Sequence, residues 1–310
     1  MKLNMDGKPL VTLRILCYNN VNKLDQAIKR LTRQDYPNIE LLISDDASKN
    51  TTKAQLEEIA KKYESHFKHI IVNRNEVNLG IVKNINKTIQ LASGDIICGA
   101  PVDDHYADDH TISRVVEYFL NHPQALVVIT RRLDETDGVI RPSKKVFHML
   151  QTDQKKYEKM MMRITPQISS AGSFCKKELF ERYGTYPETF KMVEDAPFFC
   201  NLILNGIQID CIDKVTFIHA KGGVSDPHAK PNPLWLKDRY HIFSQVLYPA
   251  SLKHDWFTRR CVRFHMQRTK EQSKLLKYLY FLLYIDVVIY NGIFFLPELL
   301  SRKTREADLP

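Results

Sequence analysis

The sequence predicts an α/β fold in which helices flank a mixed, mostly parallel sheet and a helical C-terminal extension follows. Three observations support this prediction. Short β-rich apolar runs alternate with segments of helical periodicity between Leu10 and Thr130. Polar turn residues separate these runs, as in successive βαβ units. From Trp235 onward the periodicity is helical only.

The predicted strands and helices follow one another in a regular order. Each strand is a short run of apolar and β-branched residues, and each helix carries apolar residues three and four positions apart, as at Leu24, Ile28 and Leu31. Asn, Gly and Pro residues mark the turns between them. In chain order the expected elements are strand 10–17, helix 24–31, strand 39–44, helix 52–66, strand 69–72, helix 81–92, strand 96–102, helix 107–121 and strand 126–130.

The periodicity weakens after Thr130. Between Asp134 and Thr165 the methionines at 160–162 are expected to fill core space, and the alternative is that the run 157–163 forms a helix edge that lines an acceptor groove. Gly206 is expected to end a helix because glycine favours the position after a helix C-terminus. The other expected elements here are helix 177–183 and strands 207–212 and 215–218.

The composition is that of an ordinary globular protein. The 310 residues are 44% hydrophobic and 26% charged, which suits one large or two modest domains with a substantial core. Six cysteines lie mostly in apolar contexts without CxxC spacing, which indicates reduced thiols in a cytosolic protein. The N-terminal residues lack the apolar stretch of a signal peptide, so a cytoplasmic location is expected.

The formal net charge of +9 is unevenly distributed. Residues 230–310 contain 14 Lys and Arg against 7 Asp and Glu, so most of the excess lies in the last quarter of the chain. The preceding three quarters are nearly neutral. This distribution argues against nucleic acid as a partner of the main body. It indicates that the basic C-terminal region faces a different binding partner.

The C-terminal region also contains a dense apolar stretch, residues 275–296. It is long enough to cross a bilayer, but polar residues such as Lys277 and Asp286 interrupt it and Pro297 ends it, so a simple span is not expected. A helix lying in the plane of the cytoplasmic membrane surface is one reading, and a helical pair packed on the protein is the other. Basic residues on both sides favour an anionic membrane surface. They are Arg259, Arg260, Arg263, Arg268, Lys270, Lys274, Arg302, Lys303 and Arg305.

Polar residues gather where the expected strands end. Tyr18, Asp46 and the pair Asp103-Asp104 each follow a predicted strand. In sheets of this kind ligands bind beyond the carboxyl ends of the strands. Adjacent residues there project to opposite sides, so one carboxylate of the pair could meet a divalent cation while the other accepts from a sugar hydroxyl. Taken alone, an Asp-Asp pair is more typical of a solvated acidic turn.

A series of short motifs, in this order, gives the sequence a specific resemblance. The motifs are Cys17-Tyr18-Asn19, Ser44-Asp45-Asp46-Ala47-Ser48, Asn78-Leu79-Gly80, Ala92-Ser93-Gly94-Asp95, Val102-Asp103-Asp104, Gly172 with Gly184, and Glu194-Asp195. Over residues 8 to 225 the chain resembles the family 2 nucleotide-sugar glycosyltransferases, which have the Rossmann-like GT-A fold. We therefore expect a catalytic domain at 1–225 and a basic, apolar helical region at 226–310 for membrane or acceptor association.

The resemblance implies roles for four residues in binding the sugar donor. Asp46 would hydrogen-bond the nucleotide base and Tyr18 would pack against it, which suits a pyrimidine such as uracil and hence a UDP-sugar. Asp103 would contact the ribose or the donor sugar. Asp104 would ligate Mn²⁺ or Mg²⁺, which would stabilise the departing diphosphate. Asp45 is expected to be structural, in a turn where Ser48 or Asn50 caps the next helix.

Three further residues are candidates for contacts with the diphosphate. His219 lies in a segment that resembles a histidine-containing loop of the family, where it could complete the metal site. Lys221 could neutralise phosphate charge. Lys83 follows Gly80 by less than one helical turn and could also approach the phosphates, although a solvated helix lysine is the alternative.

Asp195 is the candidate catalytic base. By resemblance it would take the proton of the acceptor hydroxyl that attacks the anomeric carbon, on the face opposite the leaving diphosphate, which inverts that carbon. Without the resemblance, Glu194-Asp195 followed by Pro197 would indicate an ordinary acidic helix N-terminus.

The expected function is an inverting, metal-dependent hexosyltransferase. It would use a UDP-sugar and a carbohydrate acceptor, lipid-linked at the inner membrane face, in assembly of bacterial O-antigen or capsule. The alternative is a non-catalytic GT-A scaffold of a membrane polysaccharide-assembly complex. No Gly-x-Gly-x-x-Gly or P-loop pattern supports a nucleotidyltransferase. The identities of the sugar and of the acceptor stay open.

Overall fold

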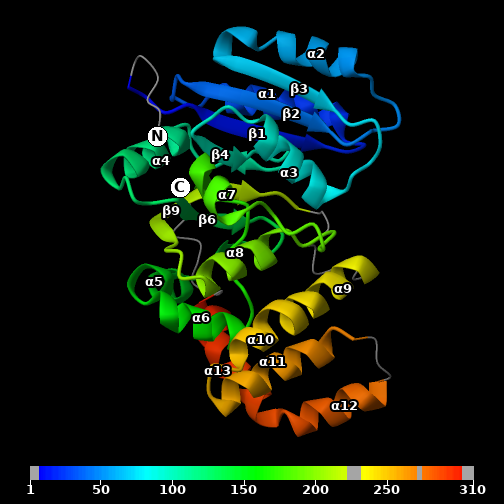
Figure 1. The fold of residues 1–310 in the computed structure, drawn as a ribbon, viewed down its shortest axis with the longest axis vertical. Coiled ribbons are helices and arrows are strands. Elements are labelled where there is room, and N and C mark those ends of the chain that lie inside the picture. Colours follow the sequence, from blue (N-terminus) through cyan, green and yellow to red (C-terminus); the bar gives the residue numbers. More distant parts are fainter. Residues whose placement is uncertain (1–6, 222–231, 271–273, 302–310) are drawn as a thin grey trace.

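A mixed sheet with helices on both faces forms the body of the molecule (Figure 1). The computed structural model describes residues 7–221, 232–270 and 274–301. Within these residues the sheet has nine strands in the order β3-β2-β1-β4-β8-β6-β9-β5, with β7 paired to β6. The strands are β1 (Val11–Cys17), β2 (Ile39–Asp45), β3 (His69–Arg74), β4 (Ile96–Gly99), β5 (His105–Tyr106), β6 (Val127–Asp134), β7 (Val139–Arg141), β8 (Ser173–Lys176) and β9 (Asp210–His219).

Helices connect the strands and continue alone to the C-terminal end of the described chain. Those of the first part are α1 (Leu24–Leu31), α2 (Lys53–Lys61), α3 (Ile81–Leu91), α4 (Thr111–Asn121), α5 (Lys144–Thr152), α6 (Gln154–Arg163), α7 (Lys177–Tyr183) and α8 (Asp195–Leu204). The later ones are α9 (Pro233–His241), a π-helical segment Ile242–Leu247, α10 (Tyr248–Ser251), α11 (Trp256–Arg268), α12 (Lys274–Leu283) and α13 (Ile285–Ser301). The predicted α/β class with a helical C-terminal extension is confirmed.

The strand register brings the candidate residues to one edge of the sheet. Strands β3, β2, β1 and β4 are parallel, and Cys17 at the end of β1 lies opposite Asp45 at the end of β2. Strand β8 runs antiparallel to both β4 and β6, so β6 has the same direction as β4. Strand β9 is in turn parallel to β6. As a result Asp134 and His219, at the ends of β6 and β9, are paired at that same edge.

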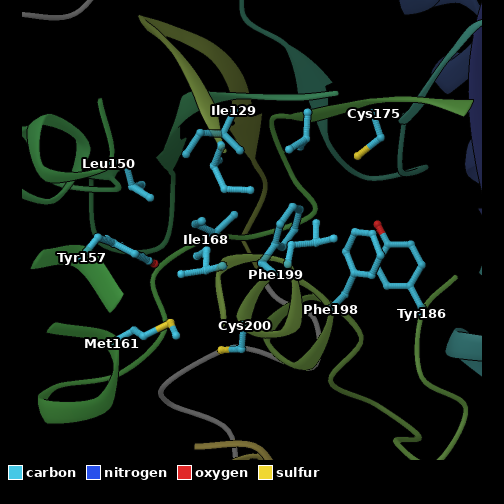
Figure 2. Packing of buried hydrophobic residues seen from close by; sticks show 14 of the residues in the cluster. Ile129, Leu150, Tyr157, Met161, Ile168, Cys175, Tyr186, Phe198, Phe199 and Cys200 are labelled. Atoms are coloured by element: carbon cyan, nitrogen blue, oxygen red, sulfur yellow. The ribbon is translucent and has the colours of Figure 1, made fainter. Parts of the chain in front are cut away.

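Two apolar clusters cover the two faces of the sheet. One packs α1 and α4 against β1 and β2, and the other packs α3, α5, α6 and α8 against the opposite face. Figure 2 shows the centre of the second cluster, where the rings of Tyr186 and Phe198 stack with centroids 4.4 Å apart. Met161 lies in this cluster, and its neighbours Met160 and Met162 are buried there too. The prediction that these methionines fill core space is confirmed.

The C-terminal helices belong to the same core as the sheet. Ile242, Phe243, Val262 and Phe294 pack in one cluster with Phe198 of α8. Figure 1 shows α9 to α13 gathered at the end of the molecule farthest from β3. The expected boundary between residues 225 and 226 lies outside the described residues. No single described helix is long and apolar enough to cross a bilayer, whereas α12 and α13 meet that test together but bend by 80° at their junction.

Several predicted boundaries were wrong for local reasons. Thr52, and neither Ser48 nor Asn50, caps α2, because its side chain and that of Gln55 form a reciprocal capping box. Strand β4 ends at Gly99, two residues before Pro101, which has no N–H for a ladder. The two strands expected at 207–212 and 215–218 form the single strand β9, which contains register shifts. The stretch 134–165 contains β7, α5 and α6.

Candidate functional site

A cavity of about 360 Å³ opens at the edge of the sheet where the candidate residues gather. We call it the central cavity. Its walls include residues from five separate parts of the chain, which the fold brings together. They are Arg14 on β1, Asp104 after β4, the Ser169-Ser170 loop, Glu194 and Asp195 at the start of α8, and His219 at the end of β9.

Asp104 and His219 form a hydrogen-bonded pair in this cavity. Both carboxylate oxygens of Asp104 lie 3.1 Å from Nδ1 of His219, and one of them also accepts from the N–H of Ala220 at 2.9 Å. The hydrogen bond to Asp104 raises the pKa of His219 above its ordinary value despite partial burial. The two residues that the sequence assigned to a metal therefore meet, although 115 residues separate them.

The pair offers one carboxylate and one imidazole, both suitable ligands for Mn²⁺ and the carboxylate for Mg²⁺. Within the described chain, no group of three or more His, Cys, Asp and Glu side chains is placed to hold a metal ion. An ion held by Asp104 and His219 would thus need further ligands from outside the protein, such as phosphate oxygens. The residues present fit a metal that binds together with a phosphorylated ligand.

Asp103 points away from its neighbour. Its side chain is 45% exposed and forms an ion pair with Lys23, with Oδ1 and Nζ 2.6 Å apart, whereas Asp104 is buried. This confirms that the two carboxylates face different surroundings. Asp103 does not line the central cavity.

Tyr18 and Asp46 lie at neighbouring strand ends, since the N–H of Asp46 donates to the carbonyl of Cys17. Tyr18 is 46% exposed, so one face of its ring is open to a ligand. Asp46 is buried, and it accepts hydrogen bonds from Asn75, Leu79 and Gly80. It therefore holds the Asn78-Leu79-Gly80 loop in place, and its contact with a nucleotide base stays a prediction.

Asp45 and Ala47 shape the same turn. Asp45 is fully buried and accepts from the backbone N–H of Ser48, which agrees with its expected structural role. Ala47 adopts a φ of 61°, in the left-handed region. This conformation is unfavourable for any residue that has a side chain. This turn fixes the direction in which Asp46 leaves β2.

Neither candidate lysine lines the central cavity. Lys83 is exposed on α3, as its alternative interpretation predicts. Lys221 is exposed just after β9, and the rest of its glycine-containing loop lies outside the described residues. The phosphate contacts of both residues stay predictions.

Glu194 and Asp195 begin α8 and face the cavity. Asp195 is the first residue of the helix, and its Oδ1 accepts from the N–H of Ala196 at 2.7 Å. Burial raises the pKa of Glu194 to about 8, and the nearby Asp195 adds to the effect. Burial also raises the pKa of Asp195, while the Ala196 N–H and the charge of Arg132 act in the opposite direction. The helix N-terminus and the acidic site are thus the same structural feature.

Arg14 is a cavity residue that the sequence analysis missed. It is only 6% exposed, its guanidinium lies over the ring of Tyr186 at 5.6 Å from the centroid, and its charge counteracts the rise in the pKa of Glu194. Among the described residues its NH1 has no hydrogen-bond partner. The signal was a charged residue inside an apolar strand, Leu13-Arg14-Ile15, where burial of a lone cation is costly.

Asp238 is a second residue that the sequence analysis missed. This buried carboxylate on α9 accepts from the backbone N–H groups of Lys191, Met192 and Val193, at 2.8, 2.6 and 3.1 Å. These residues form the loop that leads directly into Glu194. An acidic residue on a helix carried no sequence signal for this contact, because its partners lie more than forty residues earlier in the chain.

The comparison with protein families matches residues 12–184 of the chain to the family described as glycosyl transferase family 2. A curated relative, the putative colanic acid biosynthesis glycosyl transferase WcaA of Escherichia coli, is 32% identical over 123 residues. That match covers 40% of this chain and 41% of the relative, so the chain aligns with less than half of that protein.

Solved structures share this fold. TarS of Staphylococcus aureus, residues 1–349 in complex with UDP-GlcNAc, superposes with a TM-score of 0.60 at 18% identity, covering 84% of this chain and 71% of TarS. The mannosyltransferase PcManGT of Pyrobaculum calidifontis, in complex with GDP-Man and Mn²⁺, gives 0.56 at 14% identity, covering 96% and 88%. At these identities the likeness shows the fold, which is GT-A.

The raised pKa of Glu194 predicts a pH-dependent contribution to stability. Between pH about 4.5 and 8 the folded state keeps a proton on Glu194 that the unfolded state has released, so the free energy of unfolding falls as pH rises. In Glu194→Gln this contribution is absent. We expect the difference in unfolding free energy, wild type minus Glu194→Gln, to fall by at least about 1 kcal/mol between pH 5 and 8 in urea titrations.

Glu181→Gln is the matched control, because Glu181 is exposed on α7 and should give a difference that does not vary with pH. A pH-independent difference for Glu194→Gln as well would contradict the buried, protonated state of Glu194.

Proposed function

The chain belongs to glycosyl transferase family 2, and we propose that it transfers a hexosyl group from a nucleotide-diphosphate sugar to a carbohydrate hydroxyl with inversion of the anomeric carbon. The observation that carries this proposal is the central cavity, which both the Asp104–His219 pair and the Glu194–Asp195 pair line. One pair suits a charged leaving group, and the other suits a proton acceptor.

In the proposed reaction the acceptor oxygen forms a bond to the anomeric carbon while the bond from that carbon to the diphosphate breaks. The hydroxyl proton passes to Asp195, and the nucleoside diphosphate leaves with the bonding electrons. A carboxylate whose pKa burial has raised toward neutrality is a better proton acceptor than a solvated one. One displacement with one base accounts for inversion.

Asp104 and His219 are the residues that would hold Mn²⁺ or Mg²⁺. Such an ion, when bound, stabilises the negative charge that accumulates on the departing diphosphate. The protein contributes the buried carboxylate, and His219 and the N–H of Ala220 fix its orientation. The complex of PcManGT with Mn²⁺ supports this assignment.

We propose a UDP-linked sugar donor. The exposed ring of Tyr18 offers a stacking face for the base, and Asp46 at the adjacent strand end offers a buried carboxylate for a ring N–H. The complex of TarS with UDP-GlcNAc supports a uridine nucleotide. Asp103, exposed beside Lys23, is the residue proposed to contact the ribose or the donor sugar.

We propose that the acceptor is lipid-linked and that the protein works at the cytoplasmic membrane surface in assembly of a surface polysaccharide such as O-antigen or capsule. The relative WcaA is named for colanic acid biosynthesis. Helix α12 exposes a continuous set of large apolar side chains, among them Leu275 at 70%, Tyr278 at 72% and Leu282 at 69%. An exposed apolar surface of this kind marks a contact with a partner or membrane, and the basic residues nearby favour an anionic bilayer.

Asp195→Asn should reduce the rate of sugar transfer about 10²- to 10⁴-fold, because the amide accepts from Ala196 but cannot take the proton. Nucleotide release from UDP-sugars with a carbohydrate acceptor measures this. Asp153→Asn is the matched control, because Asp153 is likewise an aspartate at the start of a helix, α6, and accepts a backbone N–H there, but it lines neither the central cavity nor the one beside it. Normal transfer by Asp195→Asn would favour the non-catalytic scaffold instead.

Asp104→Ala should abolish the enhancement of UDP binding by Mn²⁺, whereas Asp103→Ala should weaken binding of the UDP-sugar even at saturating Mn²⁺. The reason is that the first carboxylate faces His219 in the cavity and the second faces solvent. Calorimetric titration of UDP with and without Mn²⁺ separates the two effects. Lys23→Met controls for loss of the ion pair with Asp103, and equal metal dependence in both aspartate variants would refute the division of roles.

Leu279→Asp together with Leu282→Asp should reduce sedimentation with vesicles of phosphatidylethanolamine and phosphatidylglycerol at least about threefold, because charge on an inserted helix face opposes burial in lipid. These substitutions are sharper than truncation, since the π-helical segment Ile242–Leu247 and α11 belong to the protein core. Leu120→Asp on α4, also exposed, is the control. Unchanged sedimentation of the double variant would show that α12 does not contact the membrane.

A further inference from the structure

A second cavity, of about 270 Å³, adjoins the central cavity. We call it the arginine cavity, because Arg132, Arg141 and Arg239 line it together with Trp235. Asp195, Arg132 and Trp235 line both cavities, so the candidate base stands where the two meet. Asp104 and His219 line the central cavity only.

The three arginines differ in how their charge is compensated. Arg132 donates to Asp134 at 2.9 Å, and Arg141 forms ion pairs with Asp134 and Asp137. These two cations are therefore already matched by carboxylates. Their positions are also fixed, because Asp134 ends β6 and binds both of them.

Arg239 has no such compensation in the part of the chain that the structure describes. Its guanidinium lies over the ring of Trp235 at 4.9 Å from the centroid, and among the described residues it has no hydrogen bond to an acceptor. Burial lowers the pKa of Arg239, and the positive charge of Arg268 acts in the same direction, while Asp195 acts against them. A partly buried cation in this state is stabilised when an anion binds to it.

Helix α9 holds both Trp235 and Arg239 rigidly. Asp238, next to Arg239, accepts three backbone N–H groups from the loop before Glu194. The stacked Trp235–Arg239 pair is thus fixed relative to Asp195. A preorganised guanidinium beside an aromatic ring suits a sugar that carries a charged group, since the ring packs on the sugar and the planar fork matches a carboxylate or phosphate.

We propose that the arginine cavity binds the acceptor and that this acceptor carries an anionic group, a phosphate or a carboxylate, which Arg239 binds. The term acceptor rests on the proposed function. The placement follows from Asp195: the acceptor hydroxyl must reach this base from a side that the metal-binding pair does not occupy, and the arginine cavity is the adjoining space. Neutral sugars could use Trp235 but not the charge of Arg239.

Fluorescence of Trp235 can report on this cavity directly. The chain has two tryptophans, and Trp256 is 63% exposed and lines neither cavity, so Trp256→Phe leaves Trp235 as the sole reporter. In this background, with UDP and Mn²⁺ saturating, three probes are titrated: glucose 6-phosphate, methyl glucuronide and methyl glucoside. The first tests phosphate, the second carboxylate, and the third the neutral sugar.

We expect at least one anionic probe to bind at least about tenfold more tightly than methyl glucoside, and to lose that advantage in Arg239→Gln. Arg239→Lys should retain part of it, which separates loss of charge from misfolding. Arg263→Gln is the matched control, because Arg263 also stacks over an aromatic ring, that of Tyr248, but is exposed and outside both cavities.

Equal binding of all three probes, or unchanged binding in Arg239→Gln, would overturn the proposal. So would binding of the anionic probes that appears only when UDP and Mn²⁺ are left out, which would make the cavity a site for the phosphates of the sugar donor. The assay requires no sugar transfer. Binding that persists while no transfer is detected would count against the proposed function alone.

Discussion

The carboxylate of Asp238 is the contact on which the arrangement of the site depends. One oxygen accepts three consecutive backbone N–H groups, from Lys191, Met192 and Val193. Buried N–H groups without an acceptor are costly, so the loop can hold this shape only while α9 is in place. The loop continues into Glu194 and Asp195, and α9 carries Trp235 and Arg239. A helix of the C-terminal region thereby sets the position of the candidate base.

This contact changes how the C-terminal region is understood. The charge excess after residue 230 and the apolar stretch at 275–296 suggested an attachment to a catalytic domain that ends before it. In the structure the π-helical segment after α9 contributes to the same core as α8, and Trp235 on α9 lines both cavities. Helix α12, with its exposed leucines, and the exposed isoleucines of α13 have the character of an attachment. One region therefore contains an internal part and a surface part.

Sequence reasoning located the fold and the residues that follow strands. Asp104, His219 and Asp195 were predicted from motifs in a fixed order, and the structure brings all three to one cavity because parallel strands end at a shared edge. Arg14 and Asp238 were missed, since their importance comes from partners far away in the chain that no periodicity reveals. The helix cap at Thr52 was missed because Ser48 and Asn50 are equally good capping residues, and only the backbone path decides among them.

The charges around Asp195 explain why the site needs Glu194 and Arg14 as well. Two adjacent carboxylates that are both ionised repel each other, and burial raises this cost. With its pKa raised to about 8, Glu194 keeps its proton at neutral pH, which removes the repulsion between two ionised carboxylates. Arg14, buried on β1, counteracts the rise in the pKa of Glu194, and the charge of Arg132 counteracts the rise in the pKa of Asp195. The protonated carboxyl of Glu194 can donate a hydrogen bond, while Asp195 beside it is the candidate proton acceptor. Two neighbouring carboxyls whose surroundings differ can thus take different roles in one cavity.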